Sequence, residues 1–357
     1  MKYYSLERIL KYNAKYNVIF GERSNGKSYS VHEKALKDYM QTGAQFAIVR
    51  RWQDDFTGKR GQAMFNGIVE SGAVERITNG EWTSIYYYSS RWYLCRHENG
   101  KRIVSDDVFA YGFAITSQEH DKSTNYPRIK NILFDEFLSR TAYIPDEFVL
   151  FCNVLSTIIR ERDDVTIFMC GNTVNRYCPY FAEMGLKHVQ EMKQGTIDLY
   201  QYGTSGLTVA VEYVQPAGKR GKKSDIYFAF DNPKLNMITN GAWEIDIYPH
   251  CPTKYRPKDI KFMYFIIFES NILQCEIVYT KTGFFTFIHP KTGAIKYPDK
   301  DIIFTISEHS HKPNIRYNIT KPFDKLGEKI YSFFKNNRVF YADNETGEIV
   351  ANYLKSL

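Results

Sequence analysis

Short apolar runs alternate with amphipathic stretches through the first half of the chain, which is the pattern of an α/β unit. A helix is expected from residue 27 to about residue 40. A second helix begins at the start signal Pro145-Asp146-Glu147, and its apolar positions between 148 and 159 share one face. Buried strands are predicted for four apolar runs, at residues 17–20, 46–49, 131–134 and 165–170, the last closed by Gly171-Asn172.

Two segments depart from this alternation. Residues 82–113 are β-rich and aromatic, and the turn Glu98-Asn99-Gly100 predicts an inserted hairpin or meander within the same domain. Residues 197–214 predict a further hairpin, with Gly203 and Gly206 at its turn.

The composition changes after residue 214, where a basic stretch rich in Pro and Gly marks a boundary. Beyond it, strands at 262–268, 272–279, 284–288 and 302–305 precede a helix near 323–337, which predicts a small α+β domain. Because 357 residues exceed one ordinary core, two domains with a connection between them are expected. We predict an α/β domain at 1–214, a basic linker domain at 215–253 and a smaller α+β domain at 254–357.

Composition narrows the class of protein. Hydrophobic residues make up 43% and charged residues 24%, as in a globular protein. The longest apolar run, residues 262–268, is too short to cross a bilayer, and the N-terminal residues do not resemble a signal peptide, so no membrane association is expected. The six cysteines contain no C-x-x-C pair, which predicts reduced core residues rather than a zinc site. The net charge of +7 suits a polyanionic partner but also occurs in ordinary enzymes.

Residues 21–28, GERSNGKS, match G-x-x-x-x-G-K-[ST] between a predicted strand and a predicted helix. Such a loop folds into a nest of backbone N–H groups at a helix N-terminus, which holds phosphates. Lys27 would reach the β- and γ-phosphates of ATP, and the hydroxyl of Ser28 would ligate Mg²⁺. The alternative, a Gly-rich turn that caps a helix, explains fewer of these residues. The predicted nucleotide-binding residues are Gly21, Arg23, Ser24, Asn25, Gly26, Lys27, Ser28 and Tyr29.

A second motif follows the apolar run at 131–134, where the strand ends in Asp135-Glu136. Asp135 would hold the metal, and Glu136 would act as general base toward the attacking water. Taken alone, the two acids could instead cap the segment that follows. The long gap between Lys27 and Asp135 suits an ATPase whose sheet has an extra strand between the two motif strands.

Further candidates carry weaker signals. Asn172, at the end of the next strand, could sense the γ-phosphate or the water, or could serve as a turn residue. Arg160 and Arg162 follow the predicted helix at 147–159; one of them could reach a neighbouring subunit's site, or both could complement the helix dipole. Lys122 is a second candidate for a contact with a neighbouring subunit.

These motifs, in this order over residues 1–185, resemble the DNA-packaging (encapsidation) ATPases of phi29-type tailed phages. The resemblance rests on residues 17–29, Phe46–Arg51 (FAIVRR), Lys122-Ser123, Tyr126-Pro127, Phe134–Phe137 (FDEF), Tyr143-Ile144-Pro145, Arg160-Glu161-Arg162 and Pro179-Tyr180-Phe181.

The resemblance implies a P-loop ATPase of the additional-strand, catalytic-glutamate type that forms a ring, pentameric in that family. With ATP and Mg²⁺ it would drive double-stranded DNA into a procapsid from the portal, in the host cytoplasm, and a structural RNA could belong to the motor. Arg160 takes the position of the trans-acting arginine finger, and Lys122 that of a second trans-acting residue. The last domain would be RNase H-like, a vestigial nuclease that has lost its metal site and binds nucleic acid.

Two other functions stay open at this stage. A terminase-like motor would also cut DNA, and Glu269, Glu276, Asp299 and Asp301 are acids that could hold metals for that purpose. A nucleotide-gated DNA-binding or assembly module would use the P-loop as a switch. Sequence-independent DNA contact is expected from the basic run after residue 214, which could equally be a solvated linker; its candidates are Lys219, Arg220, Lys222 and Lys223.

Overall fold

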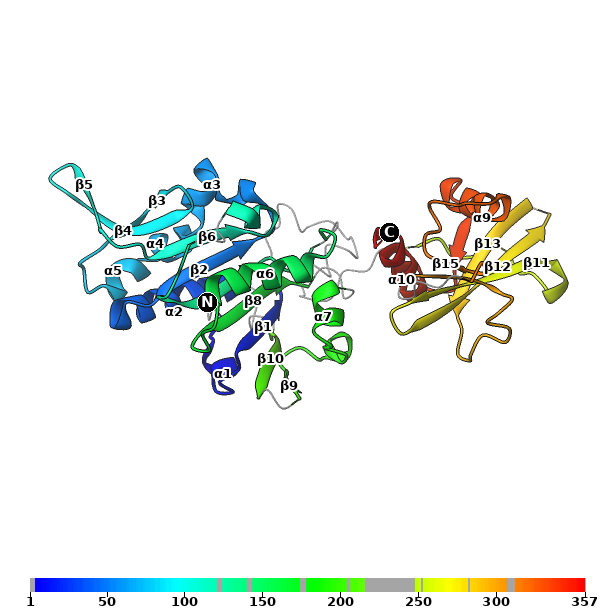
Figure 1. The fold of residues 1–357 in the computed structure, drawn as a ribbon, viewed down its shortest axis with the longest axis horizontal. Helices are drawn as coiled ribbons and strands as arrows, with labels where there is room; N and C mark the ends of the chain where they lie inside the picture. Colours follow the sequence, from blue (N-terminus) through cyan, green and yellow to red (C-terminus); the bar gives the residue numbers. More distant parts are fainter. Residues whose placement is uncertain are drawn as a thin grey trace, which may run out of the picture. The chain divides into compact units, whose positions relative to one another are not determined.

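The computed structural model divides the chain into two compact units, Met1–Glu244 and Ile245–Leu357, each of which is considered by itself (Figure 1). The structure describes residues 4–120, 124–139, 143–173, 178–203, 206–215, 248–251, 253–281, 283–306 and 312–356. Lys122, Lys219, Arg220, Lys222 and Lys223 therefore lie outside the described residues, as does most of the predicted linker.

The first unit is built on one sheet whose strand order is β3-β4-β6-β2-β7-β8-β1-β10-β9, with β5 paired to β4. Strands β6, β2, β7, β8, β1 and β10 are parallel, so their carboxyl ends meet at one edge. The strands are β1 (Tyr16–Gly21), β2 (Gln45–Arg50), β3 (Ser84–Tyr88), β4 (Arg91–Glu98), β5 (Lys101–Val104), β6 (Ala110–Ala114), β7 (Ile129–Asp135), β8 (Thr166–Asn172), β9 (Ile197–Tyr202) and β10 (Leu207–Tyr213).

Helices cover both faces of this sheet, because side chains along each buried strand alternate between two apolar cores. Val18 and Phe20 of β1 face the core under α6 and α7, whereas Ile19 faces the core under α1, α2, α4 and α5. Figure 1 shows α6 lying across one face of the strands. The helices and 3₁₀ turns are α1 (Glu7–Leu10), α2 (Lys27–Thr42), η1 (Gln53–Phe56), α3 (Gly58–Ala63), α4 (Asn66–Glu70), α5 (Ala73–Ile77), η2 (Ile115–His120), α6 (Glu147–Ile159), α7 (Pro179–Glu183) and η3 (Val189–Glu191).

Most elements predicted for this unit are present. The expected extra strand between the two motif strands is β8, which pairs with β1 on one side and β7 on the other. The predicted meander is β3 to β6, and its turn has Asn99 and Gly100 at φ 51° and 76°, as a two-residue hairpin turn requires. One detail was wrong: Gly171 and Asn172 do not close β8 but lie within it, because both pair with β1. Helices α3 to α5 were not predicted.

The second unit holds a six-stranded sheet in the order β15-β14-β11-β12-β13-β16. Strands β11, β12 and β13 form an antiparallel meander; β14 is parallel to β11, β15 to β14, and β16 to β13. Its elements are η4 (Pro257–Asp259), β11 (Ile260–Phe268), β12 (Asn271–Thr280), β13 (Gly283–Pro290), β14 (Ile302–Thr305), β15 (Ile315–Arg316), α9 (Lys325–Lys335), β16 (Val339–Tyr341) and α10 (Asn344–Lys355).

The last helix, α10, was not predicted, although it packs on this sheet through the ring contact of Phe268 with Tyr353. Residues 248–250 also join this unit, since Tyr341 donates a backbone hydrogen bond to Pro249 and His250 bridges to Tyr341. The unit therefore begins before residue 254, the start predicted for the last domain.

Two further expectations concern the cysteines and the presence of membrane-spanning helices. All six cysteines are free thiols, and Cys95, Cys170, Cys178 and Cys275 are buried. No helix among the described residues is long and apolar enough to span a bilayer.

Candidate functional site

The loop between β1 and α2 has the backbone geometry of a phosphate-binding nest. Gly26, the N-cap of α2, has φ 91°, a conformation that side chains with a Cβ rarely adopt. Ser24 is also left-handed, at φ 60°. The loop thus reverses direction within a few residues and leaves N–H groups at the start of a 16-residue helix free to face an anion.

Lys27 is buried at the base of this loop, with 6% of its surface exposed. Its Nζ donates hydrogen bonds to the carbonyl of Glu22 at 2.6 Å, to Oδ1 of Asn25 at 3.1 Å and to Oδ1 of Asn172 at 3.3 Å. Burial lowers the pKa of Lys27 to about 8, and the nearby carboxylate of Asp135 opposes that shift. The ammonium is therefore fixed toward the loop and poorly hydrated, ready to exchange these neutral acceptors for phosphate oxygens.

The two predicted motifs meet at one contact: the Ser28 hydroxyl donates a hydrogen bond of 2.6 Å to Oδ1 of Asp135. Asp135 is the last residue of β7, and Ser28 lies in the first turn of α2, which follows β1. Strand β8 separates β1 from β7, so the contact spans the carboxyl ends of three neighbouring strands. A hydroxyl and a carboxylate placed together are ligands that suit Mg²⁺.

An arginine that the motif analysis did not assign joins this site. Arg50, at the end of β2, places Nη2 2.6 Å from Oδ2 of Asp135 and Nη1 2.8 Å from Oε2 of Glu136. The Arg50 side chain is 16% exposed and that of Asp135 10%, so the charges of this pair are weakly screened, whereas the Glu136 side chain is 60% exposed and its pair with Arg50 is screened by solvent. The position of Arg50 at the end of β2 could have indicated this contact, because β2 neighbours β7 and both strands end at the same edge of the sheet.

Glu136 itself has a left-handed backbone, at φ 61°, directly after β7. Such a conformation is uncommon outside glycine, asparagine and aspartate, and it persists only where surrounding contacts hold it. Phe137, the next residue, donates its backbone N–H to the carbonyl of Cys170 on β8. The chain therefore turns sharply after Asp135 while staying attached to the sheet.

Residues of the loop, of the second motif and of the end of β8 line a cavity of about 320 Å³. It contains the predicted loop residues except Gly21, both acids of the second motif, and Asn172; Cys170 and Gly171 were not predicted to line it. Its lining residues are Arg23, Ser24, Asn25, Gly26, Lys27, Ser28, Tyr29, Asp135, Glu136, Cys170, Gly171 and Asn172.

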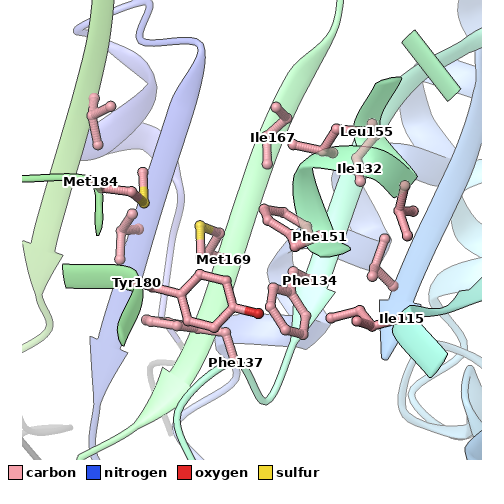
Figure 2. Packing of buried hydrophobic residues seen from close by; sticks show 14 of the residues in the cluster. Ile115, Ile132, Phe134, Phe137, Phe151, Leu155, Ile167, Met169, Tyr180 and Met184 are labelled. Atoms are coloured by element: carbon pink, nitrogen blue, oxygen red, sulfur yellow. The ribbon is translucent and has the colours of Figure 1, made fainter. Parts of the chain in front are cut away.

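A buried ion pair connects Arg51, the residue that follows β2, with Glu147, the first residue of α6. Arg51 makes two hydrogen bonds to the Glu147 carboxylate, from Nε at 2.8 Å and from Nη2 at 2.7 Å. Tyr180 of α7 donates its hydroxyl to Oε1 of Glu147 at 2.8 Å. Figure 2 shows the Tyr180 ring among Phe134, Phe137 and Phe151 of the surrounding apolar core.

Arg160 lies at the opposite edge of the sheet from the cavity. Helix α6 runs from the carboxyl end of β7 toward the amino end of β8, and its 13 residues give it a length of about 20 Å. Arg160 is exposed, has φ 54°, and donates from Nη2 to the carbonyl of Thr124 at 3.0 Å. Its side chain therefore lies at the far end of α6 from the cavity of this chain.

Arg162 is bound differently, because its guanidinium donates to backbone carbonyls on both sides of it. The acceptors are the carbonyls of Tyr126, Pro127, Ile129, Ile158 and Ile159. This side chain holds the start of β7 against the end of α6, which is a structural role.

The acids considered for a nuclease do not gather in the second unit. Glu276 accepts hydrogen bonds from Tyr255, Gln274 and His289, and Asp299 pairs with Lys312. Within the described ranges, no group of three or more His, Cys, Asp and Glu side chains could hold a metal ion.

Comparison with known proteins connects this arrangement with viral DNA packaging. The family described as Podovirus DNA encapsidation protein (Gp16) matches residues 96–202. The DNA packaging protein of Bacillus phage B103 is 25% identical over 181 residues, which cover 50% of this chain and 50% of that protein. The chain thus spans about half the length of the curated relatives it matches.

Solved structures extend the likeness in fold to nearly the whole chain. The bacteriophage Phi-29 viral genome packaging motor assembly matches with a TM-score of 0.58 and 19% identity, over 98% of this chain and 96% of that one. The Phi-28 gp11 DNA packaging motor matches with a TM-score of 0.55 and 18% identity, over 99% and 98%. The resemblance to phi29-type packaging proteins is confirmed, and the mixed α/β fold is similar to that of these motors.

Proposed function

We propose that this chain is an ATP-hydrolysing motor that translocates double-stranded viral DNA into a preformed procapsid during phage assembly. The observation that supports this proposal most directly is the hydrogen bond from Ser28 to Asp135, which joins the phosphate-binding loop to a strand followed by a second acid. The B103 relative is named a DNA packaging protein, and the matched family is one of encapsidation proteins. Both support the motor over a general nucleotide switch.

The oxygen donors at this contact fit a magnesium ion. Ser28 and Asp135 would hold it, because hydroxyl and carboxylate oxygens beside a phosphate site are the donors that Mg²⁺ takes in P-loop proteins. When bound, the ion would neutralise charge on the β- and γ-phosphates of ATP.

The other side chains of the site have separate roles in ATP hydrolysis. Glu136 accepts a proton from the water whose oxygen bonds to the γ-phosphorus, while the bond from that phosphorus to the β–γ bridging oxygen breaks and ADP leaves. Lys27 binds the β- and γ-phosphates, and Asn172, already bonded to Lys27, senses the γ-phosphate. Arg50 pairs with both acids and so orients their carboxylates.

The strand order supports the finer fold assignment. With β8 between β1 and β7, and Glu136 beside Asp135, the first unit has the features of an additional-strand, catalytic-glutamate ATPase. In the second unit, the order β13-β12-β11-β14-β15, with an antiparallel meander followed by two parallel strands, supports an RNase H-like domain. The dispersed acids favour a vestigial nuclease that binds nucleic acid over a terminase-like nuclease.

The position of Arg160 supports assembly with neighbouring subunits. Because it lies across the sheet from its own cavity, an arginine finger at this position must act on a neighbouring subunit. We propose a ring, pentameric as the resemblance implies, that docks on the portal of a procapsid in the host cytoplasm, with Lys122 as a second trans-acting residue. Lys219, Arg220, Lys222 and Lys223 would contact DNA.

Packaging of DNA into purified procapsids with ATP tests this function. Wild type should protect DNA from added nuclease, and Lys27→Ala should not; Lys37→Ala, a change to an exposed lysine on the same helix, is the matched control. Glu136→Gln should bind ATP without turning it over. Absence of DNA-stimulated ATP hydrolysis in the wild type would favour the switch, and metal-dependent cutting of DNA would favour the terminase-like motor.

A further inference from the structure

We infer that Arg51 and Glu147 are positioning residues, which together hold the general base Glu136 in its working orientation. This inference rests on the proposed ATPase function. It assigns a catalytic purpose to the ion pair behind the site, whose two members touch neither the loop nor the cavity.

The pair is buried and has the geometry of a fixed connection. The Arg51 side chain is 9% exposed and that of Glu147 is fully buried. Two parallel hydrogen bonds join them, an arrangement that sets the plane of the guanidinium as well as its distance. The Arg51 guanidinium also lies 5.3 Å from the centre of the Tyr143 ring.

The remaining donors of Arg51 are directed at the backbone of the catalytic turn. Nη2 donates to the carbonyl of Phe137 at 3.0 Å, and Nη1 approaches the carbonyl of Glu136 at 3.4 Å. These carbonyls belong to the two consecutive peptide units that follow the left-handed residue Glu136. Contacts of this kind are what an uncommon backbone conformation requires in order to persist.

Glu147 is itself held from two further sides. Its Oε2 accepts the backbone N–H of Ile144, and its Oε1 accepts the hydroxyl of Tyr180, whose ring lies within the apolar core (Figure 2). The carboxylate is therefore anchored to α6, to the segment before it and to α7. Through Arg51, this anchored carboxylate determines where the chain turns at Glu136.

A contribution to the stability of the fold does not by itself account for the presence of this ion pair. Apolar residues of similar volume would fill a core site as well or better, since removing two charges from water offsets much of their attraction. A planar guanidinium can, however, hold a carboxylate and backbone carbonyls at once in fixed directions. That property matters where a base must be placed within a fraction of an ångström.

The test separates kcat from nucleotide binding. Glu147→Gln should lower kcat for ATP about 10- to 100-fold, with less than a twofold change in the Kd of a fluorescent ATP analogue. Tyr180→Phe, which keeps the ring and removes one hydrogen bond to Glu147, should lower kcat a few-fold in a protein that is less destabilised than Glu147→Gln, because Glu147 keeps its pairing with Arg51. Arg51→Lys should behave like Glu147→Gln, because an ammonium cannot replace the planar fork.

The matched control is Asp324→Asn. Asp324 also makes two hydrogen bonds to a buried arginine, Arg316, and also lies at a helix start, but in the second unit. This variant should lose stability without losing basal kcat. In a Glu136→Gln background, Glu147→Gln should cause no further loss of the residual rate, because both changes remove the same function.

Each alternative outcome has a distinct meaning. Wild-type kcat in folded Glu147→Gln and Tyr180→Phe proteins, with Glu136→Gln inactive, would overturn the positioning role and leave the ATPase in place. Equal losses of kcat and of nucleotide affinity would also overturn it, in favour of general disruption. No turnover in the wild type would instead overturn the proposed function and this inference with it. Full turnover in Glu136→Gln would remove Glu136 from its role as general base, and so overturn this inference, while leaving the ATPase in place.

Discussion

The hydroxyl of Ser28 donates a hydrogen bond of 2.6 Å to Asp135, although the two residues are 107 positions apart in the chain. The contact exists because β1 and β7 are parallel members of one sheet and end at the same edge. It brings together the two oxygen donors expected for magnesium.

Asp135→Asn should weaken binding of ATP in the presence of Mg²⁺ by at least about tenfold, which corresponds to about 1.4 kcal/mol, because an amide oxygen carries no charge for the ion. Binding without Mg²⁺ should change much less. Titration of a fluorescent ATP analogue with and without EDTA measures both. Ser28→Ala should show the same pattern, and Asp107→Asn, which removes a carboxylate paired with Arg128 at the surface, should not.

Arg50 should compensate the Asp135 carboxylate when no metal is bound. Arg50→Ala leaves that carboxylate, 10% exposed, without its cation, which should cost about 3 kcal/mol of the free energy of unfolding. Added Mg²⁺ and ATP should then raise the Tm of the variant more than that of the wild type. Thermal unfolding with and without Mg²⁺ tests this, and equal shifts in the two proteins would contradict it.

The neighbouring arginines after α6 should behave in opposite ways. Arg162→Ala removes the donor for several backbone carbonyls and should cost about 2 kcal/mol of the free energy of unfolding, whereas Arg160→Ala should stay within about 0.5 kcal/mol of wild type. Chemical denaturation measures both.

For activity the order reverses, with Arg160→Ala the variant that should lose turnover. Mixing inactive Arg160→Ala subunits with inactive Glu136→Gln subunits should restore part of the ATPase rate, since one supplies the finger and the other the intact site. Steady-state assays over a range of mixing ratios would reveal this, and no recovery at any ratio would argue against a finger in trans.

The stability of the second unit should depend on pH through His289 and Glu276, whose side chains approach to 3.3 Å. The hydrogen bond to Glu276 raises the pKa of His289 above 6.5. Burial opposes a fall in the pKa of Glu276, but bonds from His289, Tyr255 and Gln274 outweigh it and lower that pKa below 4.5. The stabilisation from His289 is complete below pH 6.5 and is lost as pH rises through its folded pKa; that from Glu276 is lost as pH falls through its own.

The pair therefore contributes most between about pH 4.5 and pH 6.5. His289→Gln should be less stable than wild type at pH 6 by on the order of 0.5 kcal/mol, and the difference should shrink above the folded pKa of His289. Thermal unfolding of both proteins at pH 6 and pH 8.5 gives the comparison. A constant difference across that range would show that the charge of His289 contributes nothing.

The fold was predictable where local pattern decides it. The strands beside the two motifs, the hairpin turn at Asn99-Gly100 and helix α2 were expected from short runs of residues, and they are present. Helices α3 to α5 were missed because each has only five or six residues, too few to show a period. Helix α10 was missed although it begins with an Asp343 cap, since its apolar face is defined only by the sheet it covers.

The sequence by itself determined the phosphate-binding loop and the pair of acids, because each is made by consecutive residues whose backbone and side chains act together. Only the tertiary structure decided that Arg50 pairs with both acids and that Arg51 and Glu147 stand behind Glu136. The strand order determines which residues come into contact. Because β2 lies beside β7, the charged residues at the ends of these two strands meet. Burial strengthens the contacts of Arg50 with Asp135 and of Arg51 with Glu147. Burial is a property of the assembled sheet and helices rather than of any run of residues.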